Sequence, residues 1–103
     1  MISDVNDNRL IQNYSLNQNF PNPFNPSTKI SFNLEASSFV TLKVFNLLGE
    51  EVASLVNRNM NAGNHSVNFD AAKLNSGVYL YRLEANDVNG KNFTSVKKMI
   101  LTK

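Results

Sequence analysis

Few side chains in this sequence are of the types that carry out catalysis. The chain of 103 residues contains one histidine and no cysteine, so a thiolate nucleophile and a disulfide are both excluded. His65 belongs to an alternating segment with Val67 and Phe69, which favours a partly buried structural histidine over a general base. No Ser-His-Asp arrangement can be recognised from the sequence. We therefore predict no catalytic residues and no enzymatic activity.

Metal and cofactor sites are not predicted either. Asp4, Asn6 and Asn8 have the spacing of the first ligands of a calcium loop, but the later glycine and glutamate of such loops are absent. A linker is the better interpretation of this segment. Asp70 precedes two alanines, and we expect it to cap the turn that follows. The four glycines are dispersed and form no phosphate-binding loop, so no cofactor is expected.

Two tyrosines, Tyr79 and Tyr81, lie two positions apart and therefore share one face of a strand. Such a pair could stack on a sugar or a base, although packing with the phenol groups near solvent is the favoured interpretation. An alternative function therefore stays open. It is a binding or adhesion module for a carbohydrate or a protein that uses Tyr79, Tyr81 or loop residues.

The composition predicts a folded domain with a weakly charged surface. Hydrophobic residues make up 42% and charged residues 17% of the chain, and the second value is low for a globular domain. A net charge of +2 is too small to indicate a nucleic-acid partner. No apolar run approaches the roughly 20 residues that span a bilayer, so no membrane insertion is expected. The first residues do not resemble a signal peptide, and we expect any export signal to lie upstream of this sequence.

The elements that must position these side chains are short strands. Residues 28–34 and 39–46 alternate between apolar and polar side chains. Their inward positions are Ile30, Phe32, Leu34, Val40, Leu42 and Val44. Gly49 is free to take a positive φ in the next turn. Residues 51–56 form a shorter, less regular strand, and residues 57–63 form a polar loop.

The second half of the chain continues this pattern. Residues 64–70 alternate again, and residues 77–103 form a hairpin whose polar loop ends in Asn89 and Gly90. About seven short strands separated by turns predict an all-β fold, an immunoglobulin-like antiparallel β-sandwich.

Two connecting segments have features of their own. Residues 20–26 contain all three prolines and form a rigid segment that cannot join a central ladder. We expect Phe20 and Phe24 to anchor this segment in the core. Residues 70–77 are too short for a stable helix and are expected to cross between the sheets, with Leu74 in the core.

Lys97 and Lys98 are adjacent in the last strand and therefore point to opposite faces. Lysine on an edge strand protects against unwanted strand pairing, which is the structural interpretation. The functional interpretation is a basic mark near Lys103 that a receptor recognises. A terminal edge strand with free backbone groups can also pair with a receptor strand. Exposed edge strands could in addition pair between two copies to give a homodimer.

Four segments together resemble one protein family. They are residues 17–28 (NQNFPNPFNPST), 44–52 (VFNLLGEEV), 74–79 (LNSGVY) and 96–101 (VKKMIL). In this order they are similar to the type A C-terminal sorting domains of the type IX (Por) secretion system, and the resemblance covers residues 16–103. The chain is also similar to the immunoglobulin-like module of flagellar hook-capping proteins, which lacks this terminal tail.

The resemblance implies a role in export. Such domains lie at the C-terminus of large proteins of the Bacteroidetes and neighbouring phyla, whose separate N-terminal signal takes them to the periplasm. The sorting domain then directs the cargo through the outer-membrane translocon to the cell surface or the medium. The implied partners are the translocon with its shuttle components and a sortase-like cysteine peptidase. The peptidase would cut upstream of the sandwich, here within residues 3–14.

Carried over residue by residue, the resemblance assigns three sorting motifs. The matching residues are Pro21, Asn22 and Pro23 in the first motif, Leu74, Gly77 and Tyr79 in the second, and Lys97, Lys98, Met99, Ile100 and Leu101 in the terminal motif. The resemblance also implies a linker from the upstream cargo over residues 1–14 and a sorting domain over residues 15–103.

Overall fold

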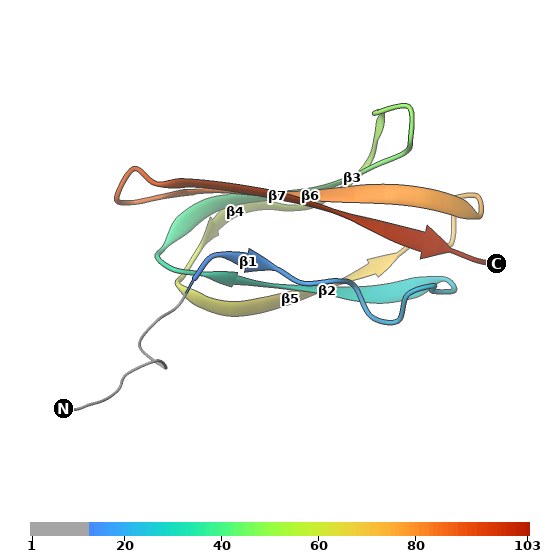
Figure 1. The fold of residues 1–103 in the computed structure, drawn as a ribbon, viewed down its shortest axis with the longest axis horizontal. Helices are drawn as coiled ribbons and strands as arrows, with labels where there is room; N and C mark the ends of the chain where they lie inside the picture. The colour runs from blue at the N-terminus through green and yellow to red at the C-terminus, as the bar shows by residue number, and fades with distance from the viewer. Residues whose placement is uncertain (1–12) are drawn as a thin grey trace.

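Two antiparallel β-sheets packed face to face make up the structure, a computed structural model that describes residues 13–103 (Figure 1). The three-stranded sheet has the order β1-β2-β5 and contains β1 (Ser15–Leu16), β2 (Ser27–Leu34) and β5 (Gly63–Asp70). The four-stranded sheet has the order β4-β3-β6-β7 and contains β3 (Ser38–Phe45), β4 (Glu51–Met60), β6 (Gly77–Asp87) and β7 (Asn92–Leu101). The calcium-loop-like segment and most of the expected linker lie outside the described residues.

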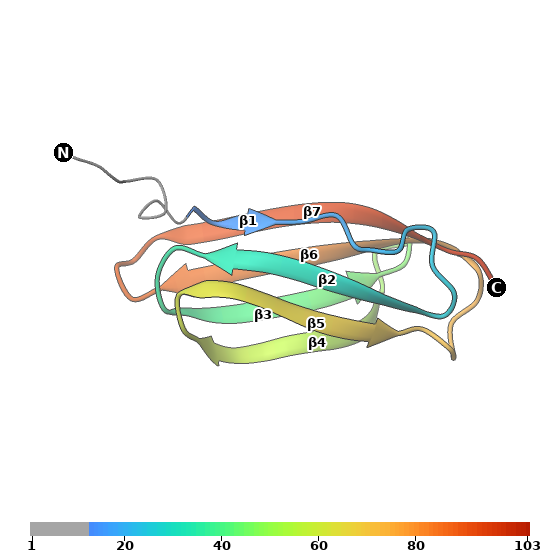
Figure 2. The same cartoon turned by 90° about the horizontal axis from the view of Figure 1, so that it is seen from below.

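This strand order is that of an immunoglobulin-like sandwich. In chain order, β1 to β7 correspond to strands A, B, C, C′, E, F and G, with A-B-E in one sheet and C′-C-F-G in the other. Figure 2 shows the two sheets lying over one another with their strands closely aligned. The predicted all-β sandwich is therefore confirmed. The described residues contain no helix long and apolar enough to cross a membrane.

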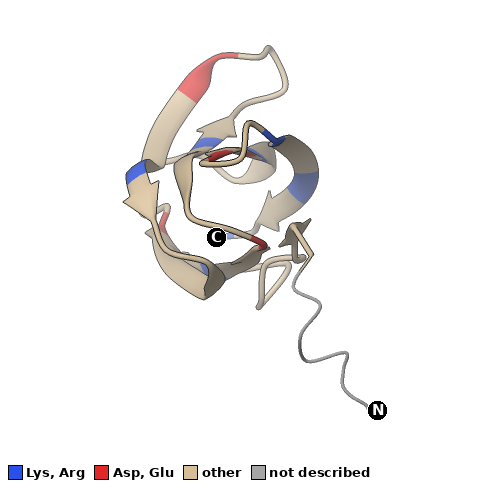
Figure 3. Cartoon of the chain, turned by 90° about the vertical axis from the view of Figure 1, so that its left-hand side faces the viewer, with Lys and Arg blue, Asp and Glu red and all other residues tan. Residues whose placement is uncertain are grey.

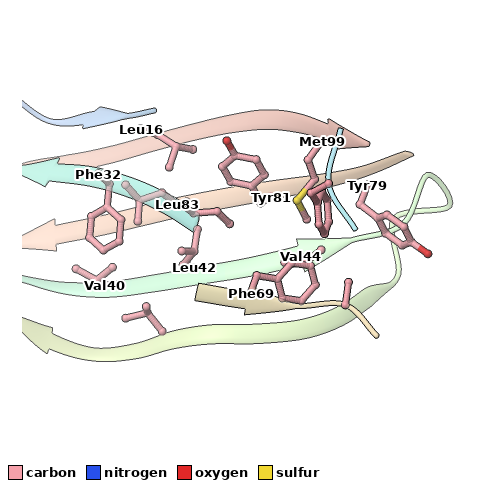
Figure 4. Packing of buried hydrophobic residues seen from close by; sticks show 14 of the residues in the cluster. Leu16, Phe32, Val40, Leu42, Val44, Phe69, Tyr79, Tyr81, Leu83 and Met99 are labelled. Carbon is pink, nitrogen blue, oxygen red and sulfur yellow. The ribbon is translucent and has the colours of Figure 1, made fainter. Parts of the chain in front are cut away.

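The core lies between the sheets and is built by alternating residues, as Figure 4 shows. All six inward positions predicted for β2 and β3 are at most 1% exposed. Figure 4 shows Leu83 and Tyr81 of β6 and Met99 of β7 projecting into the same layer. Each such side chain contributes about 1.5–3 kcal/mol by leaving water, so the alternation fixes which face of each strand turns inward.

The connections follow the predictions in most places. Gly49 has a φ of 86°, in the left-handed region that glycine adopts readily. Asp70 caps the turn after β5 by accepting a hydrogen bond from the Ala72 amide at 2.9 Å. That turn carries the chain from the three-stranded to the four-stranded sheet, and Leu74 packs against the core.

β4 is longer than predicted. It continues to Met60, so the polar loop predicted for residues 57–63 shortens to Asn61 and Ala62. The extra residues pair with β3, where Asn57 lies opposite Thr41. The side chains of Asn57, Arg58 and Asn59 are exposed on this edge strand, while Met60 packs against the core. A polar run therefore marks a solvated edge here and not a loop.

β1 is the strand that the sequence pattern does not predict. It has only two residues, which lie opposite Asn33 and Phe32 of β2. Leu16 is 6% exposed and belongs to the core. A single buried leucine in a polar segment gives no periodicity, so alternation could not identify this strand.

Only one of the two phenylalanines in the proline segment is buried in the core. Phe24 is 2% exposed, as predicted, whereas Phe20 is 80% exposed, so the prediction for Phe20 is wrong. Phe20 forms an isolated antiparallel bridge with Lys29, whose side chain is on the outer face of β2. Residues opposite one another in such a bridge share a face, so the Phe20 ring must also point outward.

Candidate functional site

The three predicted motif segments meet at one end of the sandwich, although more than 70 residues separate the first from the last. Gly77 and Tyr79 at the start of β6 lie opposite Leu101 and Met99 at the end of β7. Phe24, next to the first motif, forms an isolated parallel bridge with Leu101. We call this end, formed by residues 21–24, 74–79 and 97–103, the motif end; it lies to the right in Figure 1.

Residues 18–24, which we call the strap, run along the outer edge of β7. The Ile100 amide donates to Asn22 Oδ1 at 2.9 Å, and the Phe24 amide donates to the Ile100 carbonyl at 2.9 Å. Gln18 Nε2 donates to the Lys98 carbonyl at 2.7 Å. The expectation that the whole terminal edge strand has free backbone groups is therefore wrong for its C-terminal half. The strap forms there the hydrogen bonds that a receptor strand would otherwise form.

A small buried network holds the strap in place. The Pro21 carbonyl accepts hydrogen bonds from Thr28 Oγ1 at 2.8 Å and from Asn19 Nδ2 at 3.1 Å. Asn19 and Thr28 are only 2% and 3% exposed, and buried polar groups require partners of this kind. Gln18, Asn19 and Thr28 could not be predicted as site residues, because polar residues reveal such a role only through their partners in space.

Tyr81 of β6 forms hydrogen bonds with the backbone at the start of the strap. Its hydroxyl donates to the Asn17 carbonyl at 2.8 Å and accepts from the Asn19 amide at 2.8 Å. The side chain is fully buried, and burial raises the pKa of Tyr81 to about 12. A ring enclosed in this way has no face on which a sugar or a base could stack. The stacking role considered for Tyr81 is therefore wrong.

The second motif builds the turn that leads into β6. Tyr79 is 8% exposed, and its hydroxyl donates to the Asn75 carbonyl at 2.7 Å. This is the tyrosine corner of immunoglobulin-like domains, in which a tyrosine near the start of strand F fixes the turn before it. Gly77 has a φ of 156°, where a side chain would be strained. Tyr79 thus shapes the motif end and has no free face for stacking.

The end of the chain is fastened to the same turn. The Lys103 amide donates to Ser76 Oγ at 3.0 Å, and Lys103 Nζ donates to the Ala72 carbonyl. Free termini usually fray unless they are held by contacts of this kind. The C-terminal residues therefore have a defined position at the motif end.

The motif residues divide into an exposed and a buried group. Lys98 is exposed and lies opposite Leu80, whereas Lys97 is half-buried and lies opposite the inward-facing Tyr81. The prediction that the two lysines point to opposite faces is confirmed. Exposed or half-buried at the surface are Pro21, Asn22, Pro23, Leu74, Gly77, Lys97, Lys98 and Ile100, while Tyr79, Met99 and Leu101 are buried.

The described contacts of His65 are with an aromatic ring and a backbone carbonyl. Its ring centroid lies 5.6 Å from that of Phe32, and Nε2 lies 2.7 Å from the Asn61 carbonyl oxygen. The hollow that His65 lines contains Ser31 and Ser66 but no carboxylate. The predicted structural, partly buried histidine is confirmed. Within the described part of the chain, no three His, Asp or Glu side chains are grouped closely enough to bind a metal ion.

Charged side chains do not gather at a site. Figure 3 looks along the sandwich and shows the Lys, Arg, Asp and Glu positions as short segments separated by long stretches of uncharged ribbon. Three ion pairs lie on the surface of residues 13–103, and all of them are solvent-exposed or partly so. Such pairs contribute little to stability, so hydrogen bonding and burial fix the motif end.

Comparison with known proteins identifies the family. The family model for the secretion system C-terminal sorting domain matches residues 18–102. The chain belongs to this family. The chain is therefore a C-terminal sorting domain of type IX secretion. Such a domain interacts with the type IX secretion machinery and belongs to a protein that is secreted across the outer membrane. The match spans all three motif segments and the strap.

The structural comparison agrees with the sandwich fold. The crystal structure of CopC from Methylosinus trichosporium OB3b superposes with a TM-score of 0.56 at 12% sequence identity. The superposition covers 86% of this chain and 93% of CopC. At this identity the likeness concerns the fold alone. A search of curated protein sequences gave no match.

Proposed function

We propose that this sorting domain directs an upstream cargo through the type IX translocon by presenting the motif end as a folded recognition surface. The observation that carries the proposal is the convergence of three motifs that are separate in sequence. Hydrogen bonds from the Ile100 amide to Asn22 and from the Phe24 amide to the Ile100 carbonyl join the strap to the end of β7. The Lys103 amide donates to Ser76, which lies in the turn that Tyr79 holds. A surface assembled in this way exists only after folding, so recognising it selects folded sorting domains.

Within this proposal the motif residues have two kinds of role. The buried residues Tyr79, Met99 and Leu101 hold the surface in shape. The exposed side chains of Lys98 and the Pro21–Pro23 segment are the groups that contact the translocon or its shuttle components. The recognition is non-enzymatic and needs no cofactor, since neither role involves bond making.

We also propose that a sortase-like cysteine peptidase separates the domain from its cargo upstream of the sandwich. Tyr14 is already held against the domain, because its ring stacks on Phe93 at 5.4 Å and its hydroxyl donates to Asp87. A peptidase needs an extended, accessible segment, so the cut falls within residues 3–13. The cargo passes through the periplasm and is then anchored at the outer-membrane surface or released.

A charge reversal at Lys98 tests the recognition surface. Lys98→Glu, in a cargo fusion expressed in a type IX host, should leave most of the cargo in the periplasm, because the reversed charge repels the partner. Fractionation and immunoblotting measure where the cargo lies. The thermal midpoint of the purified domain should stay within a few degrees of the parent, since surface changes of this kind cost about 0.5 kcal/mol or less.

Arg58→Glu is the matched control, because Arg58 is an exposed cation on β4 away from the motif end. Cargo carrying this substitution should reach the surface normally. Normal delivery of the Lys98→Glu cargo would refute the proposal. Deleting residues 96–103 is a weaker test, because the deletion also removes Met99 and Leu101 from the core.

A further inference from the structure

The two sheets have four edge strands, and these differ in how well they are protected from pairing with other chains. β1 and β5 are the edges of the three-stranded sheet, and β4 and β7 are the edges of the four-stranded sheet. An unprotected edge offers a row of free backbone groups to any extended chain. Proteins protect such edges by shortness, bulges, inward-pointing charges or covering segments.

Three of the four edges carry such protection. β1 has only two residues. β7 has the half-buried Lys97 on its inward face and the strap along its C-terminal half. β4 has two register shifts against β3, and its Arg58 lies opposite the inward-facing Val40. Bulges and inward-pointing charges both oppose the docking of another strand.

Among residues 13–103, nothing of this kind protects β5. All eight of its residues pair with β2 in one continuous register. The strand Gly63–Asp70 contains no proline, lysine or arginine, and its only carboxylate is Asp70 at its end. Its inward positions are Gly63, His65, Val67 and Phe69, so no inward-pointing Lys, Arg, Asp or Glu blocks this edge. Figure 2 shows β5 at the margin of its sheet.

The direction of the free backbone groups follows from the neighbouring strand. Lys29 of β2 uses its amide and carbonyl groups for Phe20, and the Ser31 carbonyl accepts from the Asn17 amide. Backbone groups alternate in direction along a strand, so Ile30 and Phe32 turn theirs towards β5. Their partners on β5 are Val67 and His65. The amides and carbonyls of the intervening Asn64, Ser66 and Asn68 therefore point away from the sheet.

We propose that two copies of this chain associate through antiparallel pairing of their β5 strands. The two sheets then join into one six-stranded sheet in the order β1-β2-β5-β5-β2-β1. A two-fold axis at Val67 places Ser66 opposite Asn68 of the second copy and Asn64 opposite Asp70 of the second copy. No like charges face one another in this register, and the contact is closed by its own symmetry.

This choice of edge also leaves the proposed recognition surface accessible. β5 and β7 are edges of different sheets, and the strap and Lys98 belong to β7 and its covering segment. The dimer is independent of the proposed export function, because pairing uses no motif residue. Either proposal can therefore fail without the other.

Sedimentation of the chain of 103 residues at increasing concentration tests the dimer. A monomer–dimer equilibrium is expected. Ser66→Lys should weaken association by at least about tenfold, since it brings two lysines close together across the axis. Ser54→Lys is the matched control, because Ser54 is an exposed serine on the edge strand β4, and it should leave the dissociation constant unchanged.

A single cysteine provides a second measurement that does not depend on Ser66→Lys folding well. The chain has no cysteine, so Val67→Cys can form a disulfide only between two copies. Rapid dimer formation on mild oxidation is expected for Val67→Cys and not for Ser54→Cys. The proposal is overturned if the parent chain stays monomeric at its solubility limit. It is also overturned if Val67→Cys does not cross-link, or if Thr94→Lys on β7 abolishes association and Ser66→Lys does not.

Discussion

The buried hydroxyl of Tyr81 donates a hydrogen bond to the Asn17 carbonyl and accepts one from the Asn19 amide. The sequence places Tyr81 and Tyr79 on one face of a strand but does not say whether that face is wet. The structure buries both rings and gives each hydroxyl a backbone acceptor at 2.8 Å or less. Tyr81 and Tyr79 suggest a ligand site from the sequence. In the structure Tyr81 instead bonds the chain around Asn17 and Asn19, and Tyr79 bonds the turn before β6.

The pKa of Tyr81 predicts how stability depends on alkaline pH. The folded-state pKa is about 12, against about 10 for an exposed tyrosine. The unfolded chain therefore releases this proton first, and stability falls as pH rises from about 10 to about 12, with no effect below pH 10. Urea unfolding between pH 8 and pH 12 should show this decline in the parent chain and a shallower one in Tyr81→Phe.

The same substitution also lowers stability at neutral pH. Tyr81→Phe leaves the Asn19 amide and the Asn17 carbonyl without their partner, which should cost about 1–3 kcal/mol. Tyr79→Phe is the comparison, because it loses a bond to a carbonyl of the exposed Asn75 and should cost only about 0.5–1.5 kcal/mol. Identical pH dependence in Tyr81→Phe and the parent chain would contradict this assignment.

At the scale of the element, the strap changes what the last strand can do. The adjacent lysines of β7 favour an edge strand, and the prolines predict a rigid segment that stays out of a central ladder. Each prediction is right for its own segment. Neither pattern predicts that the proline segment bonds to β7, because Asn22 and Ile100 are 78 positions apart. The edge that the sequence suggests for a receptor is half covered by the chain itself.

Asn22→Ala tests the strap. Without the Asn22 side chain the Ile100 amide loses its acceptor, so its hydrogen exchange should accelerate by about 3–10-fold, the equivalent of about 0.5–1.5 kcal/mol. Exchange measured by NMR at residue level resolves this amide. Asn25→Ala is the control, because Asn25 is an exposed asparagine three positions further along the same segment. Equal exchange in the two variants would show that the strap bond is not formed in solution.

At the scale of the whole molecule, the two ends of the sandwich have different tasks. The motif end carries the strap, the tyrosine corner and the chain end. The opposite end holds the entry of the chain, where the Tyr14 hydroxyl contacts Asp87 and Ser38. The hydrogen bond from Tyr14 holds the pKa of Asp87 below its usual value. The chain therefore enters the sandwich at the end opposite the proposed recognition surface.

Limited proteolysis should find the start of the folded domain at Tyr14. Protease should trim residues before Tyr14 and spare the rest, because its ring is stacked on Phe93. Tyr14→Ala removes both the stacking and the hydroxyl contacts, so the first protected residue should move to β1, at Ser15 or Leu16. Mass spectrometry of the trimmed products gives this boundary. An unchanged boundary in Tyr14→Ala would contradict the role given to Tyr14.

The sequence by itself determined the fold class, the inward faces of β2, β3 and β5, the cap at Asp70 and the family. These features depend on alternation, turn residues and motifs, all of which are local along the chain. Only the tertiary structure decided that Phe20 is exposed, that β4 extends to Met60, that Tyr81 bonds the strap and that the three motifs form one surface. Each of these depends on which backbone groups and faces remain after distant strands have paired, and no local pattern contains that information.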